Sequence, residues 1–347
     1  MRAVQLVTEG KVPGLSLGEV QARPPRADEV LVKVGAVYVG TRERSSVSGN
    51  RANYWPDRPK PGLPIILGYQ AGGTVVQAGA DSPIKVGTRI FVNGFVDCGK
   101  CDACMDGQQN LCPNHSLLGI DIDGCLAEQV TLPWRCVFPC PDSIPMKLIP
   151  AVSEVSTALH GFRCAGSVAG RSVAVIGGGD IGATAAKLAK LFGAKPIVVV
   201  EPNEEPRKRL QKILPDLDIR ASAKDLRAEY DFAFEASNVA SGIEDSIACL
   251  RRNGKAIIFS ALGETTLRFK ALYSEWHTRE IQIIASNAKT PVDVRDSIDL
   301  LAKHEELRAA FNLEAVPMEG AAQVVADFAA YKRRVPVCVF PAGQTET

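Results

Sequence analysis

The segment of this chain that most restricts its fold is VAVIGGGDIG, residues 173–182. Four apolar residues, typical of a buried strand, are followed by three glycines. After them, apolar residues recur with the spacing of one helix face. Gly177, Gly179 and Gly182 form the pattern G-x-G-x-x-G between this strand and this helix. Such a turn lets the backbone approach a pyrophosphate, which the helix N-terminus attracts. The segment predicts a dinucleotide-binding α/β domain whose cofactor contacts are Gly177, Gly179, Asp180, Ile181 and Gly182.

The strand that follows this helix, PIVVVE, ends at Glu201. An acidic side chain at this position accepts hydrogen bonds from the adenosine ribose hydroxyls and repels a 2′-phosphate, so it favours NAD over NADP. Arg207 is a further candidate cofactor contact, and with Lys208 it leaves open how strict the preference for NAD is.

The character of the chain changes twice along its length. Before Pro150, short alternating or apolar runs are separated by Gly, Pro and Asp turns, which indicates a β-rich region. After it, strand-like and helix-like segments alternate, as in a doubly wound parallel sheet. From about residue 287, two helix-like segments precede a last strand, VPVCVF. This order predicts one domain interrupted by another.

Four of the ten cysteines lie within the fifteen residues CGKCDACMDGQQNLC. A thiolate quartet with the spacing C-x2-C-x2-C-x7-C surrounds one zinc ion with no open position, so the site is structural. An iron–sulfur cluster is the competing interpretation, but the polar Asp-Gly-Gln-Gln loop suits an exposed lobe better. We expect a zinc-binding lobe at about residues 94–115, with the ligands Cys98, Cys101, Cys104 and Cys112.

Charge and hydropathy exclude several classes of partner. The net charge is +1 and the charges are scattered, so nothing favours binding to nucleic acid or to an anionic membrane. No run approaches the roughly 20 apolar residues of a membrane span. The first residues turn polar too soon for a signal peptide. We therefore expect a soluble, cytoplasmic protein.

With these motifs, nearly the whole chain resembles the medium-chain dehydrogenase/reductase superfamily, in its branch of zinc-containing alcohol and polyol dehydrogenases. The resemblance is carried by GTRIFVNGFVDCGKCDACMDGQQNLC and VIGGGDIGATAAKLAKLFGA, and by their order and separation. It implies a GroES-like catalytic domain over residues 1–153 and 287–347, and an inserted Rossmann NAD-binding domain over residues 154–286. It further implies an active site in the cleft between them, a small-molecule substrate, and a homodimer or homotetramer.

Members of this branch hold a second, catalytic zinc, and its ligand positions are changed here. The ligands normally are a Cys in a Cys-Gly-Ser/Thr-Asp turn, a His in a Gly-His-Glu turn, and a Cys or Glu at the start of a helix. The corresponding segments here are YVGTRERS, LGYQAGG and PAVSEVSTALHG. They place Val39, Tyr69 and Ser153 at the ligand positions, with Glu154 next to the last. We therefore predict that the catalytic zinc is absent, and that His160 packs rather than ligates.

Without this metal, hydride transfer needs another group to handle the developing charge. Thr41 keeps a hydroxyl that family enzymes use in a proton relay. Tyr69 either acts as an acid–base group, activated by a nearby cation, or only fills the space of the metal site. Arg42, which replaces the family's Asp, and Arg44 are such cations, and either could instead bind a substrate anion.

Two reactions fit these residues, with NAD(H) as cofactor. One is reduction of a conjugated C=C or C=N bond, and the other is metal-free oxidation of an alcohol. A non-catalytic NAD-binding protein is the third possibility. The aromatic residues Tyr54 and Trp55 precede the Tyr69 turn and either line the substrate site or pack the loop.

Overall fold

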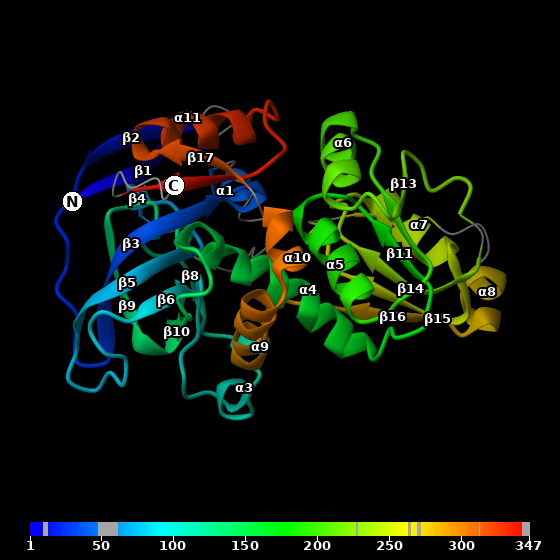
Figure 1. Cartoon of the computed structure of the whole chain (residues 1–347), viewed down its shortest axis with the longest axis horizontal. Coiled ribbons are helices and arrows are strands. Elements are labelled where there is room, and N and C mark those ends of the chain that lie inside the picture. The colour runs from blue at the N-terminus through cyan, green and yellow to red at the C-terminus, as the bar shows by residue number, and fades with distance from the viewer. Residues whose placement is uncertain are drawn as a thin grey trace. The chain divides into compact units, whose positions relative to one another are not determined.

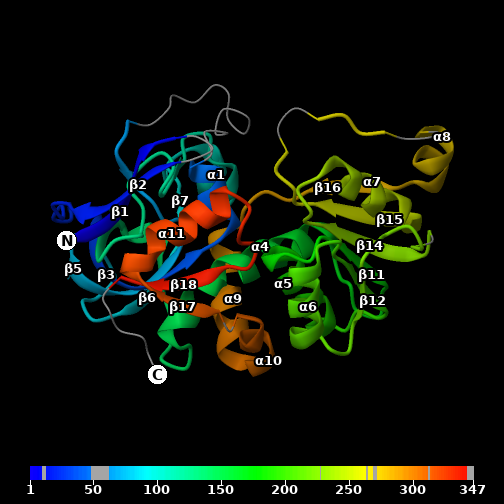
Figure 2. The ribbon, with the colours of Figure 1, turned by 90° about the horizontal axis from the view of Figure 1, so that it is seen from above.

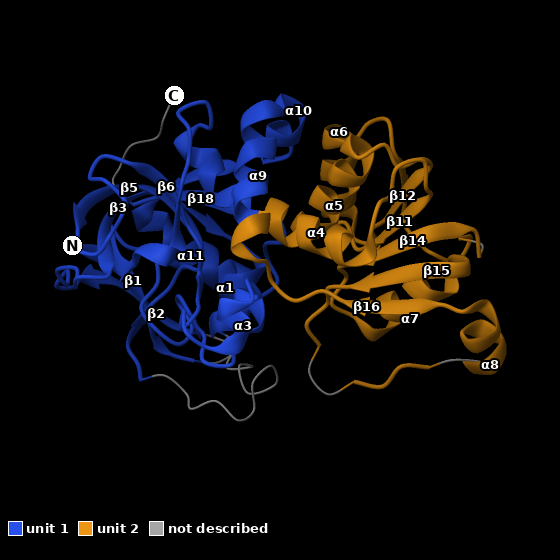
Figure 3. Ribbon diagram, turned by 90° about the horizontal axis from the view of Figure 1, so that it is seen from below, with its two compact units in different colours: residues 1–153, 294–347 blue, residues 154–293 orange. Residues whose placement is uncertain are grey.

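The computed structural model describes residues 1–9, 13–47, 62–226, 228–262, 265–268, 272–311 and 313–341. The chain divides into two compact units (Figure 3). Unit 1 combines Met1–Ser153 with Val294–Thr347, and unit 2 is Glu154–Asp293. The first strand and the last strand of the chain therefore lie in the same unit (Figure 1). None of the described helices has the length and apolar character that crossing a membrane requires.

Unit 1 is built mainly of antiparallel strands. Its largest sheet has the order β10-β6-β5-β3-β18-β17, and β9 also pairs with β3. Smaller sheets have the orders β2-β1-β4 and β7-β8. The strands are β1 (Arg2–Thr8), β2 (Gly14–Glu19), β3 (Glu29–Val39), β4 (Ile65–Ile66), β5 (Ala71–Ala78), β6 (Arg89–Val92), β7 (Phe95–Val96), β8 (Ser116–Leu117), β9 (Gln129–Pro133), β10 (Val137–Pro139), β17 (Glu314–Pro317) and β18 (Val337–Phe340).

Helices cover parts of these sheets and close the core of unit 1. The α-helices are α1 (Thr41–Val47), α3 (Asp102–Met105), α10 (Glu305–Arg308), α11 (Met318–Ala329) and, reaching into unit 2 at its first turn, α9 (Pro291–Lys303). Helix α11 packs against α1. The core consists mostly of Val, Leu and Ile side chains from β1, β3, β5, β6 and α11, as β-branched residues fit a pleated surface covered on one face.

Two glycines shape the turn that carries Tyr69. Gly68 has φ +98°, and a Cβ there would overlap the backbone nitrogen of Leu126. A Cβ on Gly94 would overlap the backbone oxygen and the ring of Tyr69. Only glycine therefore allows the chain to reverse between β4 and β5 and to seat the Tyr69 ring against the backbone.

Unit 2 contains a six-stranded sheet in which every pair of neighbours is parallel. The strand order is β13-β12-β11-β14-β15-β16, which is the order 3-2-1-4-5-6 of dinucleotide-binding folds. Helices α5 and α7 pack against this sheet (Figure 2). The strands are β11 (Val173–Ile176), β12 (Ile197–Val200), β13 (Asp218–Arg220), β14 (Tyr230–Glu235), β15 (Leu250–Ile258) and β16 (Gln282–Ala285). The helices are α4 (Val152–Ala165), α5 (Asp180–Leu191), α6 (Glu204–Ile213), α7 (Ala240–Ala248) and α8 (Leu272–Glu275).

Candidate functional site

The glycine turn of unit 2 joins β11 to α5, which begins with Asp180 and Ile181. Gly177 has φ +98°, and a Cβ on Gly182 would overlap the carbonyl oxygen of Gly177. A Cβ on Gly179, in contrast, would have no atom within 4 Å. The turn is therefore closely packed on one side and open at the N-terminus of α5, which fits a pyrophosphate held by backbone N–H groups.

Glu201 lies directly after β12 and its carboxylate faces this turn. Its Oε2 accepts a hydrogen bond from the backbone N–H of Gly178 at 2.9 Å, and its Oε1 accepts one from the N–H of Asn203 at 2.7 Å. The guanidinium of Arg207 donates to the carbonyl oxygens of Glu201 and Pro202, at 3.0 and 2.7 Å. The acidic residue expected at the ribose is thus connected to the glycine turn through Gly178.

The four cysteines of the predicted zinc lobe come together in unit 1. Their Sγ atoms all lie within 4.8 Å of one another, and three of the pairs are 3.5, 3.8 and 4.0 Å apart. Zn–S bonds of about 2.3 Å in a tetrahedron separate the sulfur atoms by roughly 3.8 Å. The donor set and its spacing therefore fit one tetrahedral zinc ion, with Cys101 and Cys104 positioned by the short helix α3.

The surroundings of the cysteines differ in polarity. The backbone N–H of Lys100 lowers the pKa of the Cys98 thiol to about 6, because it stabilises the thiolate. Burial raises the pKa of Cys104 to about 12. Metal binding requires deprotonated sulfur, so a zinc ion would supply the charge that keeps the buried thiols ionised.

Tyr69 and Arg42 face each other in unit 1. Tyr69 is buried, with 4% of its surface exposed. The Cζ atom of Arg42, the second residue of α1, lies 4.6 Å from the centroid of the Tyr69 ring, a distance at which a cation is attracted by the ring face. Arg44 lies instead over Tyr331, again at 4.6 Å, because residues two positions apart point to different sides of a helix.

The other predicted catalytic residues divide between the units. Thr41 is half-buried and is the first residue of α1. It directly precedes Arg42, which contacts Tyr69. Glu154 is buried and belongs to unit 2. Tyr54 and Trp55 fall outside the described residues.

His160, on α4, is paired within unit 2. Its Nδ1 lies 2.8 Å from Oδ2 of Asp293, whose Oδ1 accepts a hydrogen bond from Arg163 at 2.7 Å. Burial alone would raise the pKa of Asp293, but the hydrogen bonds from His160, Thr290 and Arg163 hold it at about 2. These contacts around the buried carboxylate of Asp293 give His160 a structural partner.

Comparison with known proteins identifies the relatives of the chain. Residues 26–142 match the family described as alcohol dehydrogenase GroES-like domain, and residues 181–303 match the family described as zinc-binding dehydrogenase. L-threonine 3-dehydrogenase of Pyrococcus horikoshii is 30% identical over 270 residues, which cover 75% of this chain and 76% of that protein. The chain belongs to the zinc-containing medium-chain alcohol dehydrogenase family.

Other relatives agree with this assignment. Sorbitol dehydrogenase of Bacillus subtilis is 29% identical over 243 residues, 67% of each chain. A protein of Sinorhizobium meliloti 1021, in a structure bound to NADP, superposes with a TM-score of 0.85 at 26% identity, over 98% of this chain and 99% of that one. The predicted fold, a GroES-like domain with an inserted Rossmann domain, is confirmed. The protein is an NAD(P)-dependent dehydrogenase of the medium-chain type that acts on a small molecule.

The structure of the dehydrogenase also draws attention to Glu43, which the sequence interpretation passed over. Glu43 is the third residue of α1, has 2% of its surface exposed, and its Oε2 accepts the backbone N–H of Gly40 at 2.8 Å. Burial raises the pKa of Glu43 to about 7, against the lowering effect of the backbone N–H of Gly40. The signal that could have revealed it is Gly-Thr-Arg-Glu, because a Glu in the third helical position characterises a capping box.

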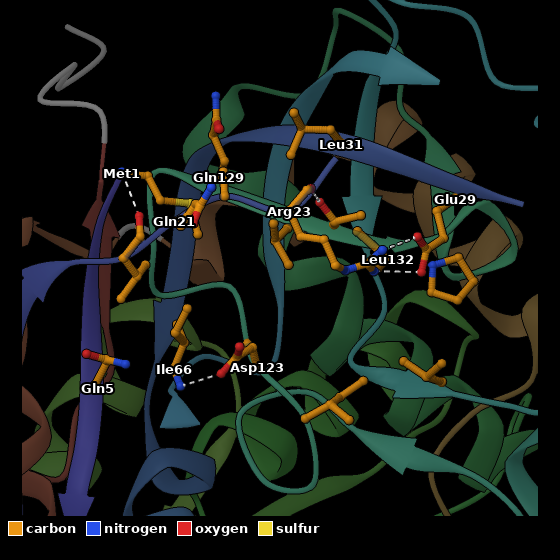
Figure 4. A pocket seen from close by; sticks show the side chains of 18 of the residues that line it. Met1, Gln5, Gln21, Arg23, Glu29, Leu31, Ile66, Asp123, Gln129 and Leu132 are labelled. Atoms are coloured by element: carbon orange, nitrogen blue, oxygen red, sulfur yellow. Dashed lines mark hydrogen bonds and ion pairs between the residues drawn. The ribbon is translucent and has the colours of Figure 1, made fainter. Parts of the chain in front are cut away.

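A cavity of about 450 Å³ lies elsewhere in unit 1 of the dehydrogenase (Figure 4). Its charged lining residues already have partners: Arg23 forms an ion pair with Glu29 at 2.7 Å, and Asp123 accepts the backbone N–H of Ile66 at 2.9 Å. None of the predicted catalytic or metal-binding residues lines this cavity, so we do not assign the chemistry to it.

Proposed function

We propose that this dehydrogenase transfers hydride between NAD(H) and a small organic substrate without a catalytic zinc. The observation that carries the proposal is the guanidinium of Arg42 above the ring of Tyr69, at 4.6 Å. The resemblance puts a zinc ligand at the position of Tyr69, and a cation beside it would repel a metal ion. Valine at position 39 has no lone pair, and the neutral hydroxyl groups of Tyr69 and Ser153 are poor ligands beside thiolate and imidazole.

In this proposal the two parts of the chain have different tasks. Residues 154–286 form the NAD-binding domain, and residues 1–153 with 287–347 form the catalytic domain with one structural zinc on the cysteine quartet. When bound, NAD(H) supplies or accepts the hydride. The residues that would hold it are Gly177, Gly179, Asp180, Ile181, Gly182, Glu201 and Arg207, and the acidic Glu201 favours NAD over NADP.

The reaction we favour is the reduction of a conjugated C=C or C=N bond. Hydride adds to one end of the double bond, the bond's electron pair moves toward the conjugated acceptor, and a proton completes the product. Tyr69 donates this proton from its hydroxyl, because the adjacent Arg42 cation stabilises the phenolate that remains. Thr41 relays the proton from solvent, and Glu154 is a further candidate catalytic residue on the side of the NAD-binding domain.

A second reaction is favoured by the names of the relatives, which include L-threonine 3-dehydrogenase and sorbitol dehydrogenase. In this case the substrate is an alcohol that loses hydride and becomes a carbonyl compound. Tyr69, as phenolate, accepts the hydroxyl proton of the substrate and Thr41 passes it on. The same residues serve both directions, since acid and base exchange roles when a reaction is reversed.

The test is a substrate panel with the purified full-length protein and its Tyr69→Phe variant. We expect NADH-dependent reduction of conjugated enones or imines, and a loss of roughly 10²–10⁴ in kcat for Tyr69→Phe, with the Kd of NADH unchanged. Turnover of alcohols alone would favour the second reaction. Tight NADH binding without turnover of any compound would show a non-catalytic NAD-binding protein. Full activity of Tyr69→Phe would limit Tyr69 to packing.

A further inference from the structure

Glu235, the last residue of β14, has none of its surface exposed. Its Oε1 accepts hydrogen bonds from the backbone N–H and the hydroxyl of Ser237, at 2.7 and 2.6 Å, and from the hydroxyl of Ser260, at 2.7 Å. Its Oε2 accepts the backbone N–H of Ser260 at 3.2 Å. Across the residues that the structure describes, its side-chain partners are these two serines and no basic residue. A carboxylate buried in this way depends on such donors for its stability.

The two serines lie in loops that follow neighbouring parallel strands. Residues 236–239, the β14 loop, follow β14, and residues 259–261, the β15 loop, follow β15. Asn238 links the two loops a second time. Its backbone N–H donates to the hydroxyl of Ser260 at 2.6 Å, and its Oδ1 accepts the backbone N–H of Ala261 at 3.1 Å. Hydrogen bonds around one buried carboxylate therefore tie the two loops together.

The β14 loop packs against the glycine turn that we expect to hold the pyrophosphate. A Cβ on Gly177 would lie 2.7 Å from Cα of Ser237 and 2.8 Å from the carbonyl carbon of Ala236, so the two backbones are in direct contact. Strands β11 and β14 are neighbours, and the strand order reverses between them. Ligands of open α/β sheets bind outside the carboxyl ends of the strands at this point. The β14 loop therefore borders the dinucleotide site of the fold.

The order of the strands assigns the two loops to one half of the cofactor. In folds with the order 3-2-1-4-5-6, each half of the sheet is a mononucleotide-binding unit. Glu201, which we expect at the adenosine ribose, follows β12 in the first half. Strands β14 and β15 belong to the second half. Their loops are thus available to the nicotinamide mononucleotide, the half of NAD(H) that carries the hydride.

We propose that Glu235 is a positioning residue for the nicotinamide half of NAD(H), because its carboxylate holds the β14 loop and the β15 loop in the shape that this half requires. The inference rests on the proposed function, in which residues 154–286 bind NAD(H). Glu235→Gln keeps the size of the side chain but replaces one acceptor oxygen by an NH₂ donor. Whichever oxygen is replaced, the NH₂ group faces the backbone N–H of Ser237 or of Ser260, which then loses its acceptor.

The test compares two ligands of the purified full-length protein by calorimetry. These are NADH and ADP, which contains the adenosine and pyrophosphate parts alone. For Glu235→Gln we expect the Kd of NADH to rise about tenfold or more, while the Kd of ADP changes less than about twofold. An unchanged Kd of NADH, or Kd values of both ligands that rise by the same factor, would overturn the proposal.

Asp231→Asn is the matched control. Asp231 is the second residue of the same strand, near its amino end, and its Oδ2 accepts the backbone N–H and the hydroxyl of Ser172, at 3.0 and 2.9 Å. The substitution disturbs a carboxylate with a similar set of donors, away from the carboxyl edge of the sheet. We expect it to leave the Kd of NADH and the Kd of ADP unchanged. A rise in the Kd of NADH equal to that of Glu235→Gln would reduce the role of Glu235 to general stability.

A second variant and a second readout decide the question if Glu235→Gln does not fold. Ser260→Ala removes only the hydroxyl that bridges Glu235 and the backbone N–H of Asn238, and it should raise the Kd of NADH selectively, by a smaller factor. In hydrogen exchange of the full chain without ligand, peptides covering the two loops should exchange faster in this variant than in the unchanged protein. Unchanged exchange would refute the link between the loops. If the unchanged protein binds no NADH, the proposed function fails, and hydrogen exchange still decides whether the loops are linked.

Discussion

The raised pKa of Glu43 has a consequence for the stability of the fold. The folded pKa of about 7 exceeds the ordinary value of 4.5, so the folded state binds this proton more tightly than the unfolded state does. The contribution of Glu43 to the free energy of unfolding is therefore complete below pH 4.5 and is lost as the pH rises through 7. The two pKa values differ by about 2.5, which corresponds to a change of about 3 kcal/mol in the free energy of unfolding. About 2.5 kcal/mol of this change falls between pH 5 and pH 8.

The perturbation is Glu43→Gln, which keeps the shape of the side chain and cannot ionise. The assay is urea unfolding at pH 5, 6, 7 and 8, with Trp134 as the fluorophore of unit 1 after Trp55→Phe and Trp276→Phe in both proteins. We expect the unfolding free energy of the protein with Glu43, minus that of Glu43→Gln, to fall by about 2.5 kcal/mol from pH 5 to pH 8. A difference that stays constant, or that grows with pH, would refute the assignment of a buried, neutralised carboxyl to position 43.

Three further predictions follow from the described contacts. Arg42→Leu should lower kcat by about tenfold or more, because it removes the cation beside Tyr69. Arg44→Leu, which loses the contact with Tyr331, should keep kcat; equal rates of the two variants in steady-state assays would contradict the pairing. Cys101→Ser should reduce the zinc content from one ion to nearly none, as read by atomic emission, and should lower the urea midpoint of unit 1. Asp293→Asn should lower the free energy of unfolding by about 2 kcal/mol at pH 7. The stabilisation by the carboxylate is present above pH 4 and is lost as the pH falls toward 2. An unfolding free energy equal to that of the unchanged protein at pH 7 would contradict the role of these contacts.

Local patterns made much of this fold predictable. The strand, glycine turn and helix around residue 177 are encoded by neighbouring residues, and the structure has them as β11, Gly177 and α5. The four cysteines were recognisable because metal ligands require particular donors at short spacing. The elements that were missed are short. Helix α1, TRERSSV, has no apolar face of helical period, and strands β13 and β17 have three and four residues.

The relations that define the candidate catalytic site depend on contacts that no local pattern contains. The sequence places Arg42 and Arg44 equally close to a former ligand position. In the structure, the two side chains point to different sides of helix α1, so that Arg42 contacts Tyr69 and Arg44 contacts Tyr331.

We propose that the hydride-transfer site operates without a metal ion. The most direct measurement is the number of zinc ions per chain, by atomic emission, in a preparation whose NADH-dependent turnover is measured in parallel. We expect one zinc per chain, held by Cys98, Cys101, Cys104 and Cys112, and full turnover at that stoichiometry. Two zinc ions per chain in the active protein, or turnover that rises in proportion to a second zinc, would contradict it.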